Sequence, residues 1–429
     1  MTKNKLLKNI SWLFFDKIIR ILGGLFVGIW VARYLGPSDF GLLNYSLAYT
    51  GLFILFVNLG LDQIVIREIV KKSKLTYYIL GTAFWLKVMG SVVAIISIYI
   101  SLQFVEMDSI TKIIILILSM GFIVQSVDVI DYFYQSQILS KYVVIARNSA
   151  FIFSSLLKVF LILQKYSVVY FAIAGIIDVI LVAFFLFLIY EKTGGKLLQW
   201  RFSKKIAIRL LKFSWPLALS IFLISLHLKI DQVMIGNMLD IEQVGIYSIA
   251  VKLAEFWIFI PSILVSTLMP YFVNLRDTNN ELYYYRLSQL YSLLFWMGVF
   301  VGGVTLIFGK DIIKLLYGEA YIDAYLALVI NIWNGVFISQ AIARGIWMIN
   351  ENLQIYRVYN NVLSVATNII LNIILIPKYG ISGAAVSSIL SIGVGTWIYP
   401  LLFAPMRNST VMMIMSIVPI NLIIRRRKK

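Results

Sequence analysis

Apolar runs of about twenty residues recur along the whole chain of 429 residues, and no other feature constrains its fold as strongly. Inside a bilayer only helices and closed barrels satisfy every backbone polar group, and runs of this length fit helices. The pattern therefore predicts an all-α polytopic membrane protein. We place about twelve transmembrane helices, at residues 11–32, 42–61, 77–103, 112–138, 142–163, 168–190, 212–236, 243–272, 286–308, 322–349, 354–376 and 381–405.

The composition agrees with a chain that lies mainly in lipid. Hydrophobic residues make up 61% of it and charged residues 14%, with a mean hydropathy of +0.89. A soluble domain would carry about 25% charged residues. The net charge of +18 could indicate nucleic-acid binding in a soluble protein. In a membrane protein, basic cytoplasmic loops explain the same excess, so we expect no nucleic-acid partner.

The distribution of basic residues over the predicted loops indicates an orientation. If the N-terminus is inside, 27 of the 38 lysines and arginines lie on the cytoplasmic side and six lie outside. The remaining five lie within the apolar segments. Because the bias alternates from loop to loop without a break, it supports both the helix count and the orientation. We expect a multi-pass protein with both termini in the cytoplasm.

The two halves of the chain resemble each other weakly. The longest connection, about residues 191–211, lies on the predicted cytoplasmic side and separates two sets of six helices. The turn after the first helix of each set aligns without gaps, which places Gly41 on Gly245. Because six is even, both halves have the same orientation, as in a parallel repeat. We expect an N-terminal six-helix lobe over residues 1–200 and a C-terminal six-helix lobe over residues 201–407.

The last residues of the chain form a separate segment. Residues 411–424 are apolar but too few to span a bilayer comfortably, and residues 425–429 are all basic. A thirteenth span would carry these five charges to the outside. We therefore expect residues 408–429 to form a basic interfacial tail on the cytoplasmic side, held by anionic lipid.

Several classes of function are disfavoured by what the sequence lacks. It has no Gly-x4-Gly-Lys-Ser/Thr loop for a nucleotide, no cysteine, and a single histidine, His227, so it has no histidine-based or thiolate metal site. Asp128 and Asp131 share a helix face and could be a metal-binding pair, but a metal-dependent sugar transferase also needs a substrate-binding domain. The predicted outer loops are too short for a polymerase or ligase. We expect no enzyme, no catalytic residue, no cofactor and no metal.

Ionised side chains inside the apolar segments are the candidate functional residues. A charge near the centre of a bilayer costs about 2.5–3.5 kcal/mol, so it needs a wet cavity or a partner. We expect these residues, as a set, to line a substrate-binding cavity, and we assign no separate role to single members. They are Arg20, Lys87, Asp128, Asp131, Lys158, Lys229, Asp231, Lys252 and Glu255.

Some of these charges also have a purely local explanation. Arg20 follows Asp16 by four residues, and the two could form an ion pair that reaches the interface. Lys252 and Glu255 are three residues apart and could neutralise each other. Arg344 is close to the inner end of its helix, so we expect its side chain to extend to the membrane surface.

Other charges point to partners further away. Asp231 could pair with His227 or with Lys229 on the same helix. Lys87 and Lys158 have no nearby carboxylate in the sequence, so their partners should lie on other helices or on a ligand.

Proline and glycine mark where helices should bend or end. Gly36-Pro37 lies in a short polar stretch between the first two apolar segments and predicts a tight turn. Pro261 lies inside the eighth segment, and because it lacks an N–H it should interrupt and kink that helix.

The stretch Arg33–Gly41 resembles the first turn of the Wzx-type polysaccharide flippases, which share a superfamily with the MATE exporters and the peptidoglycan-precursor flippases. The resemblance implies two six-helix lobes that form a V around a central cavity, open alternately to each side. Arg20 lies in a motif similar to one of the peptidoglycan-precursor flippases, whose arginine lies in a cationic cavity. Further stretches similar to the Wzx type follow in order at residues 60–61, 67–68, 231–236, 244–247, 250–255, 261, 270, 316–318 and 378–384.

The resemblance implies a flippase of the bacterial cytoplasmic (inner) membrane. Its substrate would be an oligosaccharide repeat unit on polyprenyl diphosphate, of the O-antigen (lipopolysaccharide) or capsule type, moved from the inner to the outer leaflet by alternating access. Expected partners are this lipid-linked oligosaccharide, membrane lipids, and a polysaccharide polymerase with its chain-length machinery. The alternative is a MATE-type small-molecule exporter coupled to H+ or Na+. The deeper intramembrane charges, five of each sign, leave both open.

Overall fold

The computed structural model describes residues 3–351 and 353–417, and within these ranges every regular element is a helix. The chain divides into two compact units, Met1–Lys229 and Ile230–Lys429. The division falls inside one helix, α9 (Lys204–Met238), which begins in the first unit and ends in the second. The lobe boundary that we expect at residue 200 lies before this helix begins and stays a prediction.

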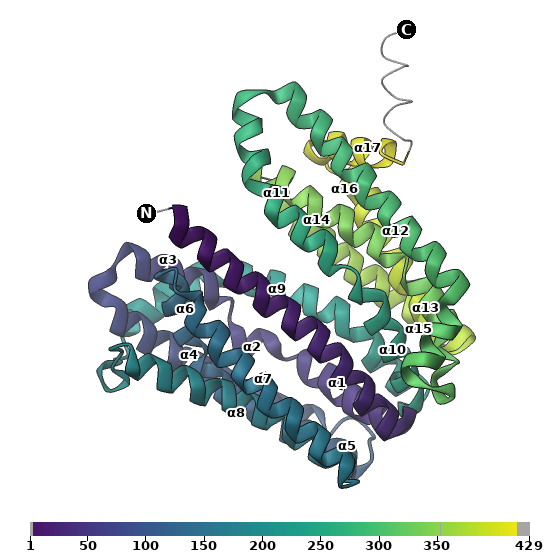
Figure 1. The fold of residues 1–429 in the computed structure, drawn as a ribbon, viewed down its shortest axis with the longest axis horizontal. Coiled ribbons are helices and arrows are strands. Elements are labelled where there is room, and N and C mark those ends of the chain that lie inside the picture. The colour runs from purple at the N-terminus through teal and green to yellow at the C-terminus, as the bar shows by residue number, and fades with distance from the viewer. Residues whose placement is uncertain (1–2, 352, 418–429) are drawn as a thin grey trace. The chain divides into compact units, whose positions relative to one another are not determined.

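The first unit starts with α1 (Lys3–Gly51) (Figure 1). It is broken at Gly36, whose φ of 70° and ψ of 175° are not helical, directly before Pro37. The predicted turn at this position is therefore confirmed. The other helices of the unit are α2 (Ile54–Asn58), α3 (Leu61–Lys71), η1 (Ser73–Leu75), α4 (Thr76–Ser101), α5 (Ser109–Val124), η2 (Gln125–Asp128), α6 (Val129–Ser136), α7 (Ser140–Leu163), α8 (Val168–Lys192) and η3 (Leu197–Gln199), followed by most of α9.

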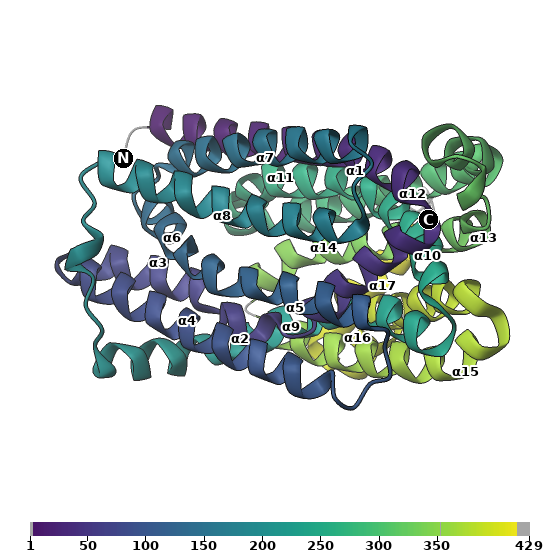
Figure 2. The ribbon, with the colours of Figure 1, turned by 90° about the horizontal axis from the view of Figure 1, so that it is seen from below.

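Side-by-side helix packing forms the core of the first unit. α7 packs along α8 and α1, and α5 packs along α8 (Figures 1 and 2). α3 packs on α6, and α2 packs on α4. Apolar side chains from α3, α4, α6, α7, α8 and α9 form one buried cluster, which includes Leu61, Leu80, Ile130, Leu186 and Leu210.

The backbone is interrupted twice within the second predicted span. α1 ends at Gly51, α2 is only five residues long, and Leu59 and Gly60 both have positive φ, at 50° and 62°. A Cβ on Gly60 would lie 2.5 Å from the backbone nitrogen of Ala218 on α9, so this contact requires glycine. Irregular backbone inside a membrane is tolerated where protein covers it. Here the N-terminal half of α9 covers it.

The second unit contains the remaining helices. α15 is interrupted at Gly380, whose φ is 59°, and is followed by a five-residue π-helix. The helices are α10 (Ile241–Phe256), α11 (Phe259–Thr278), α12 (Asn280–Tyr317), η4 (Glu319–Tyr321), α13 (Ala324–Asn331), α14 (Asn334–Asn350), α15 (Ile355–Gly393), the π-helix η5 (Val394–Ile398), α16 (Tyr399–Leu402), η6 (Ala404–Met406) and α17 (Arg407–Met415).

The second unit has its own packed interior. α12 packs on α14 and α13, α10 packs on α13, and α13 packs on α15. A buried cluster joins α11, α12, α14 and α17 and includes Phe272, Tyr291, Ile346, Trp347 and Met413. α17 therefore packs on protein through one face. Residues 418–429, which carry the five terminal basic residues, lie outside the described part of the chain, and the interfacial tail at 408–429 stays a prediction.

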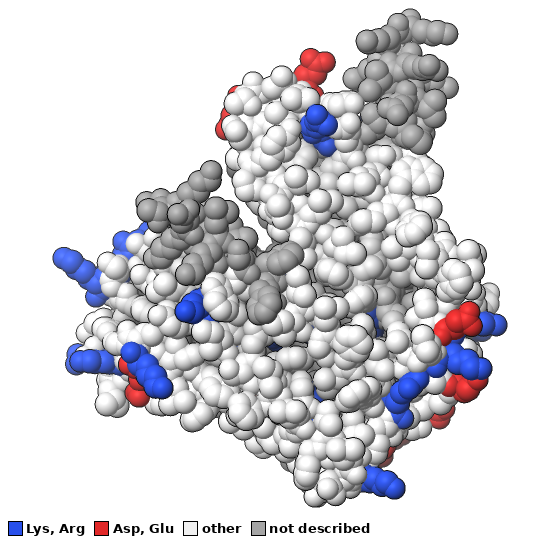
Figure 3. Space-filling view, viewed as in Figure 1, with Lys and Arg blue, Asp and Glu red and all other residues white. Residues whose placement is uncertain are grey.

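Ten helices in the described ranges are long and apolar enough to cross a membrane. Two of them, Asp16–Gly51 and Ile355–Leu402, each contain a non-helical glycine, Gly36 or Gly380. Ile355–Leu402 takes in the predicted segments 354–376 and 381–405, whereas Asp16–Gly51 takes in segment 11–32 and only the first half of segment 42–61, which continues in α2. Most of the surface seen in Figure 3 carries no charged side chain, as expected of helices that face lipid. The predicted all-α polytopic membrane fold is confirmed.

The predicted interruption of the eighth segment is also confirmed. α10 ends at Phe256 and α11 begins at Phe259, and Pro261 lies in the first turn of α11. A proline is tolerated there because the first N–H groups of a helix have no partner within the helix. The break therefore lies one turn before the proline.

Candidate functional site

Lys87 lies at the centre of a buried group of charges in the first unit. Its side chain is completely buried in α4, and its Nζ donates a hydrogen bond to the hydroxyl of Tyr132 at 3.3 Å. The ammonium group also lies 5.4 Å from the centre of the Tyr132 ring. The carboxylates that attract it are Asp128, Asp62 and Asp131. The partners of Lys87 thus lie on other helices, where the sequence predicted that they or a ligand must be.

Asp131 forms an ion pair with Arg147 at the edge of this group. Its Oδ2 lies 2.7 Å from a guanidinium nitrogen of Arg147 on α7, and its Oδ1 accepts a hydrogen bond from Gln135 at 2.9 Å. Asp131 is buried, whereas Arg147 is partly exposed. Asp128 is half-buried one turn earlier, in η2. The sequence pattern placed the two aspartates on one helix face, and the structure gives them cationic side chains as neighbours.

Three further candidates in the first unit stand apart from this group. Lys158 on α7 is half-buried, and the charge that acts on it is that of Asp178 on the neighbouring helix α8. Arg20 is exposed on α1, and its charge acts on Asp16, one turn earlier. Lys229 packs its aliphatic stem against Gly51, at the end of α1.

The second unit contains a different kind of polar site around Asp231. This carboxylate is 5% exposed and accepts hydrogen bonds from Tyr247 at 2.9 Å, from Asn372 at 2.7 Å and from Ser388. Asn372 also donates to Asn368 at 3.3 Å. The site therefore joins α9, α10 and both halves of α15.

The sequence identified Asp231 but not its amide and hydroxyl partners. Asn368 and Asn372 are four residues apart in an otherwise apolar run, which places both on one face of the helix. Polar residues inside a membrane helix point inward or toward a partner. This spacing is the signal that could have found them.

The remaining two candidates, Lys252 and Glu255, lie together on α10. Both side chains are exposed, and both take part in further polar interactions. The structure does not bring them into the group around Asp231. The role of all nine candidates in substrate binding stays a prediction.

The expectation for Arg344 is wrong. Its side chain is 3% exposed and does not extend to the surface of the second unit. A guanidinium nitrogen donates to the carbonyl of Thr396 at 2.6 Å, and two nitrogens contact the sulfur of Met413 at 2.7 and 3.0 Å. The carbonyl of Thr396 belongs to the π-helix η5, and the sulfur of Met413 belongs to α17. Both elements follow α14 in the chain, and their packing buries a side chain that would otherwise reach the interface.

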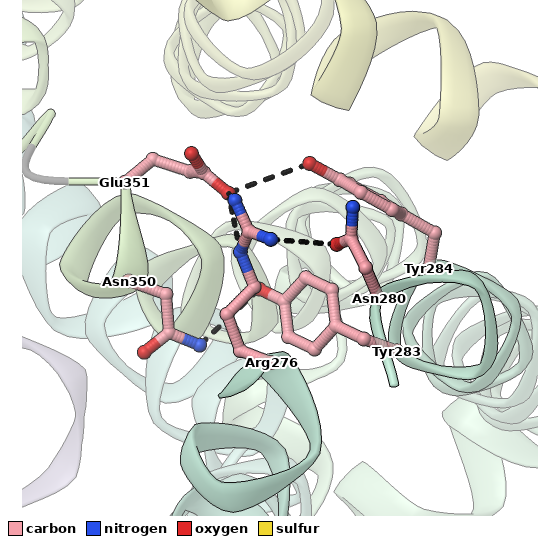
Figure 4. Close-up of polar contacts among 6 residues, drawn as sticks. All are labelled: Arg276, Asn280, Tyr283, Tyr284, Asn350 and Glu351. Carbon is pink, nitrogen blue, oxygen red and sulfur yellow. Dashed lines mark hydrogen bonds and ion pairs between the residues drawn. The ribbon is translucent and has the colours of Figure 1, made fainter. Parts of the chain in front are cut away.

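An ion pair that the sequence did not indicate connects three helices of the second unit (Figure 4). Arg276, in the last turn of α11, lies 2.9 Å from Glu351 at the end of α14, and donates to Asn280 at 2.7 Å. The hydroxyl of Tyr284 donates to the same carboxylate at 3.4 Å. The partners are 75 residues apart in the sequence, which is why no local pattern pointed to them.

No three side chains of His, Cys, Asp or Glu in the described ranges gather into a group that could hold a metal ion. The buried lysine, arginines and aspartates are held by hydrogen bonds and ion pairs within each unit. Ionisable side chains inside membrane helices generally face protein or water and pair with one another, as these do.

The fold is that of a known class of transporters. An inward-facing structure of a multidrug resistance MATE family transporter of the MOP superfamily matches this chain with a TM-score of 0.71 at 15% sequence identity. The match covers 94% of this chain and 98% of the transporter chain. The lipid II flippase MurJ, in an inward closed conformation, also has a TM-score of 0.71 at 15% identity, over 96% of this chain and 92% of its own. At this level of identity the likeness shows the fold.

The chain belongs to the polysaccharide biosynthesis protein family, which its residues 6–276 match. The capsular polysaccharide biosynthesis protein CapF of Staphylococcus aureus is 24% identical over 404 residues, which cover 90% of this chain and 96% of CapF. The probable flippase AglR of Haloferax volcanii is 26% identical over 186 residues, which cover 39% of this chain and 36% of AglR. This last match therefore spans about a third of AglR. The resemblance that the sequence motifs indicated is confirmed.

Proposed function

We propose that this protein moves a polyprenyl-diphosphate-linked oligosaccharide from the inner to the outer leaflet of the cytoplasmic membrane by alternating access. The observation that carries the proposal is the family membership of residues 6–276, together with a fold shared with a lipid II flippase. Repeat units of the O-antigen or capsule type are the proposed cargo. CapF, whose name refers to capsular polysaccharide, matches nearly the whole chain.

The buried charges of the first unit are compatible with such a cargo. The sugars and the diphosphate cannot cross hydrocarbon, whereas the polyprenyl tail can remain in it. Arg147 is the partly exposed cation of this group, where an anionic head group could compete with Asp131 for the guanidinium, whereas Lys87 is completely buried. An inside-negative potential would favour outward movement of a negative head group by about 2.3 kcal/mol per charge per 100 mV.

Deletion of the gene tests this proposal directly. We expect surface polysaccharide to be lost and the lipid-linked repeat unit to accumulate on the inner leaflet, because the polar head cannot cross the hydrocarbon unaided. The measurement is chemical labelling of surface glycan and mass spectrometry of extracted lipid-linked intermediates. Complementation with the intact gene is the control. Unchanged surface glycan in the deletion strain would contradict the proposal.

The same strain distinguishes the second candidate, a MATE-type exporter coupled to H+ or Na+. The observation that favours this candidate is the equal TM-score to the multidrug transporter. Such an exporter would leave surface glycan intact and would change the rate at which cationic dyes leave the cell. Efflux of ethidium, followed by fluorescence in deletion and complemented strains, separates the two functions.

A further inference from the structure

Glu68 on α3 is a buried carboxylate that three cations surround. Its side chain belongs to a residue that is 7% exposed. A guanidinium nitrogen of Arg67 lies 3.4 Å from one carboxylate oxygen, and Nζ of Lys72 and a guanidinium nitrogen of Arg209 each lie 4.0 Å from the other. Arg209 is near the beginning of α9, so the group joins α3 to α9 within the first unit. One negative charge faces three positive charges, which leaves an excess of positive charge at this point.

The three cations retain hydrogen-bond donors that another anion could use. At 4.0 Å, the nitrogens of Lys72 and Arg209 are too far from the carboxylate of Glu68 for a hydrogen bond. An ammonium group carries three N–H donors and a guanidinium group five. The side chains of Arg67, Lys72 and Arg209 are 41%, 41% and 38% exposed. A ligand from outside can therefore reach all three cations while Glu68 stays in place.

The beginning of α9 presents basic and apolar side chains in neighbouring stripes. Lys205, Arg209 and Lys212 follow one another at helical spacing, and residues 204–230 contain no acidic residue. A second stripe consists of exposed apolar side chains, which are Ile208, Leu211 and Trp215. The guanidinium of Arg67 lies over the exposed ring of Phe213, 5.0 Å from its centre. Helices with basic residues beside exposed Trp, Phe and Leu lie where lipid head groups meet acyl chains. The apolar stripe therefore favours a lipid over a soluble anion.

The sequence predicts that this end of the first unit faces the cytoplasm. Lys71 and Lys74 are exposed there as well, at the end of α3 and just after it. The cytoplasmic leaflet of a membrane carries a negative surface potential, which attracts basic residues close to it. In the predicted orientation, anionic head groups of this leaflet lie at the depth of the cations around Glu68.

We propose that Arg67, Lys72 and Arg209 bind the phosphate of an anionic phospholipid, whose acyl chains lie along the apolar stripe of α9. Guanidinium groups form paired hydrogen bonds to phosphate oxygens, and the ammonium group of lysine adds a third charged donor. The excess of positive charge selects a head group with net negative charge over a zwitterionic one, in which an amine cancels the charge of the phosphate.

The bound lipid would hold α3 and α9 together. Without it, the three cations repel one another, and Glu68 neutralises only one of them. The sequence predicted contact with anionic lipid at residues 408–429, whereas this site belongs to the first unit. The proposal concerns lipid binding and holds whether the cargo is a glycan or a small molecule.

Lipid binding to the purified full chain tests the proposal. The protein in neutral detergent is titrated with phosphatidylglycerol or with phosphatidylcholine, and native mass spectrometry counts the bound lipids. We expect one phosphatidylglycerol to bind saturably and more tightly than phosphatidylcholine. Equal binding of the two lipids would overturn the proposal. Displacement of phosphatidylglycerol by an equal concentration of inorganic phosphate would also overturn it, because the ligand would then be a soluble anion.

Two double variants locate the site. Lys72→Gln with Arg209→Gln should weaken phosphatidylglycerol binding by about 25-fold, since each basic residue near a membrane surface contributes a factor of about five. Lys74→Gln with Lys196→Gln removes the same charge from exposed lysines on the same predicted side, and should leave this binding nearly unchanged. If both pairs weaken binding equally, lipid responds only to the total charge of the surface and the proposed site is refuted.

Glu68→Gln distinguishes a lipid site from a purely structural group of ion pairs, and it also covers the case in which the Lys72 and Arg209 variant does not fold. The substitution removes the internal anion and keeps all three cations. We expect its thermal midpoint to fall in phosphatidylcholine nanodiscs, because the cations then repel one another without compensation. Phosphatidylglycerol nanodiscs, which offer the lipid in both leaflets, should raise this midpoint by more than they raise that of the unmodified chain. An equal or smaller rise would contradict the proposal.

Discussion

Lys87 is a residue whose buried charge costs free energy of folding and at the same time balances the charges of neighbouring aspartates. It is completely buried, and its one hydrogen bond goes to a tyrosine hydroxyl. Three aspartates act on its charge, and one of them, Asp131, is already paired with Arg147. Removal of Lys87 would leave Asp62 and Asp128 with less positive charge nearby. A buried charge group of this kind is destabilised by loss of one partner more than by loss of both.

We therefore expect Lys87→Met to lower the thermal midpoint and Lys87→Met with Asp128→Asn to recover part of the loss. The coupling free energy should be about 0.5–3 kcal/mol, as found for residues in one charge network. The measurement is a double-mutant cycle on the midpoint in nanodiscs. Lys74→Met, at an exposed lysine, is the control and should have little effect. Strictly additive effects would show that the two side chains do not interact.

Among the elements, the interrupted second span is the feature that depends most on its neighbours. α2 is too short to be stable by itself, and the two residues after it have positive φ. α4 and α9 hold it in place. A Cβ on Gly90 of α4 would lie 2.0 Å from the carbonyl oxygen of Phe56, and a Cβ on Gly60 would meet the backbone of α9. Glycine thus permits both contacts.

We expect Gly60→Ala to destabilise the protein by about 2 kcal/mol or more, because it combines an unfavourable φ with a clash against backbone atoms that cannot move aside. Gly28→Ala is the matched control, since its Cβ would meet nothing within 4 Å and its backbone is helical. Thermal midpoints and the yield of folded protein measure the difference. Equal behaviour of the two variants would mean that the contact between Gly60 and α9 is not formed.

At the scale of the whole molecule, the testable feature is the orientation in the membrane. The charge bias of the loops predicts that both termini are cytoplasmic, with the loop near Lys196 inside and those near Lys165 and Lys310 outside. The chain contains no cysteine, so single cysteines can be introduced into an otherwise unreactive background. All three lysines are exposed.

We expect Lys165→Cys and Lys310→Cys to react with a membrane-impermeant maleimide on intact cells. Lys196→Cys should react only after the membrane is permeabilised. Gel-shift labelling of each variant gives the readout, and the unmodified chain gives the background. If Lys196→Cys were labelled on intact cells while Lys310→Cys was protected, the orientation would be reversed and with it the proposed direction of transport.

The sequence by itself determined where the helices lie and where they break. Whether a segment spans the membrane depends on the summed hydrophobicity of about twenty consecutive residues. Because this sum involves only neighbours in the sequence, it can be evaluated without knowledge of the fold. Breaks at Gly36 and near Pro261 follow from the backbone chemistry of single residues. The sequence also found the charged residues, because any charge stands out in an apolar run.

Only the tertiary structure decided which partners these charges have. Asp231 meets Asn372 across 141 residues of sequence, and Arg276 meets Glu351 across 75. Arg344 is buried because the π-helix and α17 provide acceptors that come later in the chain. The partner of a buried charge is set by which helices pack together. Helix packing depends on the fit of many side chains at once, and not on the hydrophobicity of one stretch of sequence. For that reason the spans could be placed from the sequence and the partners of their charges could not.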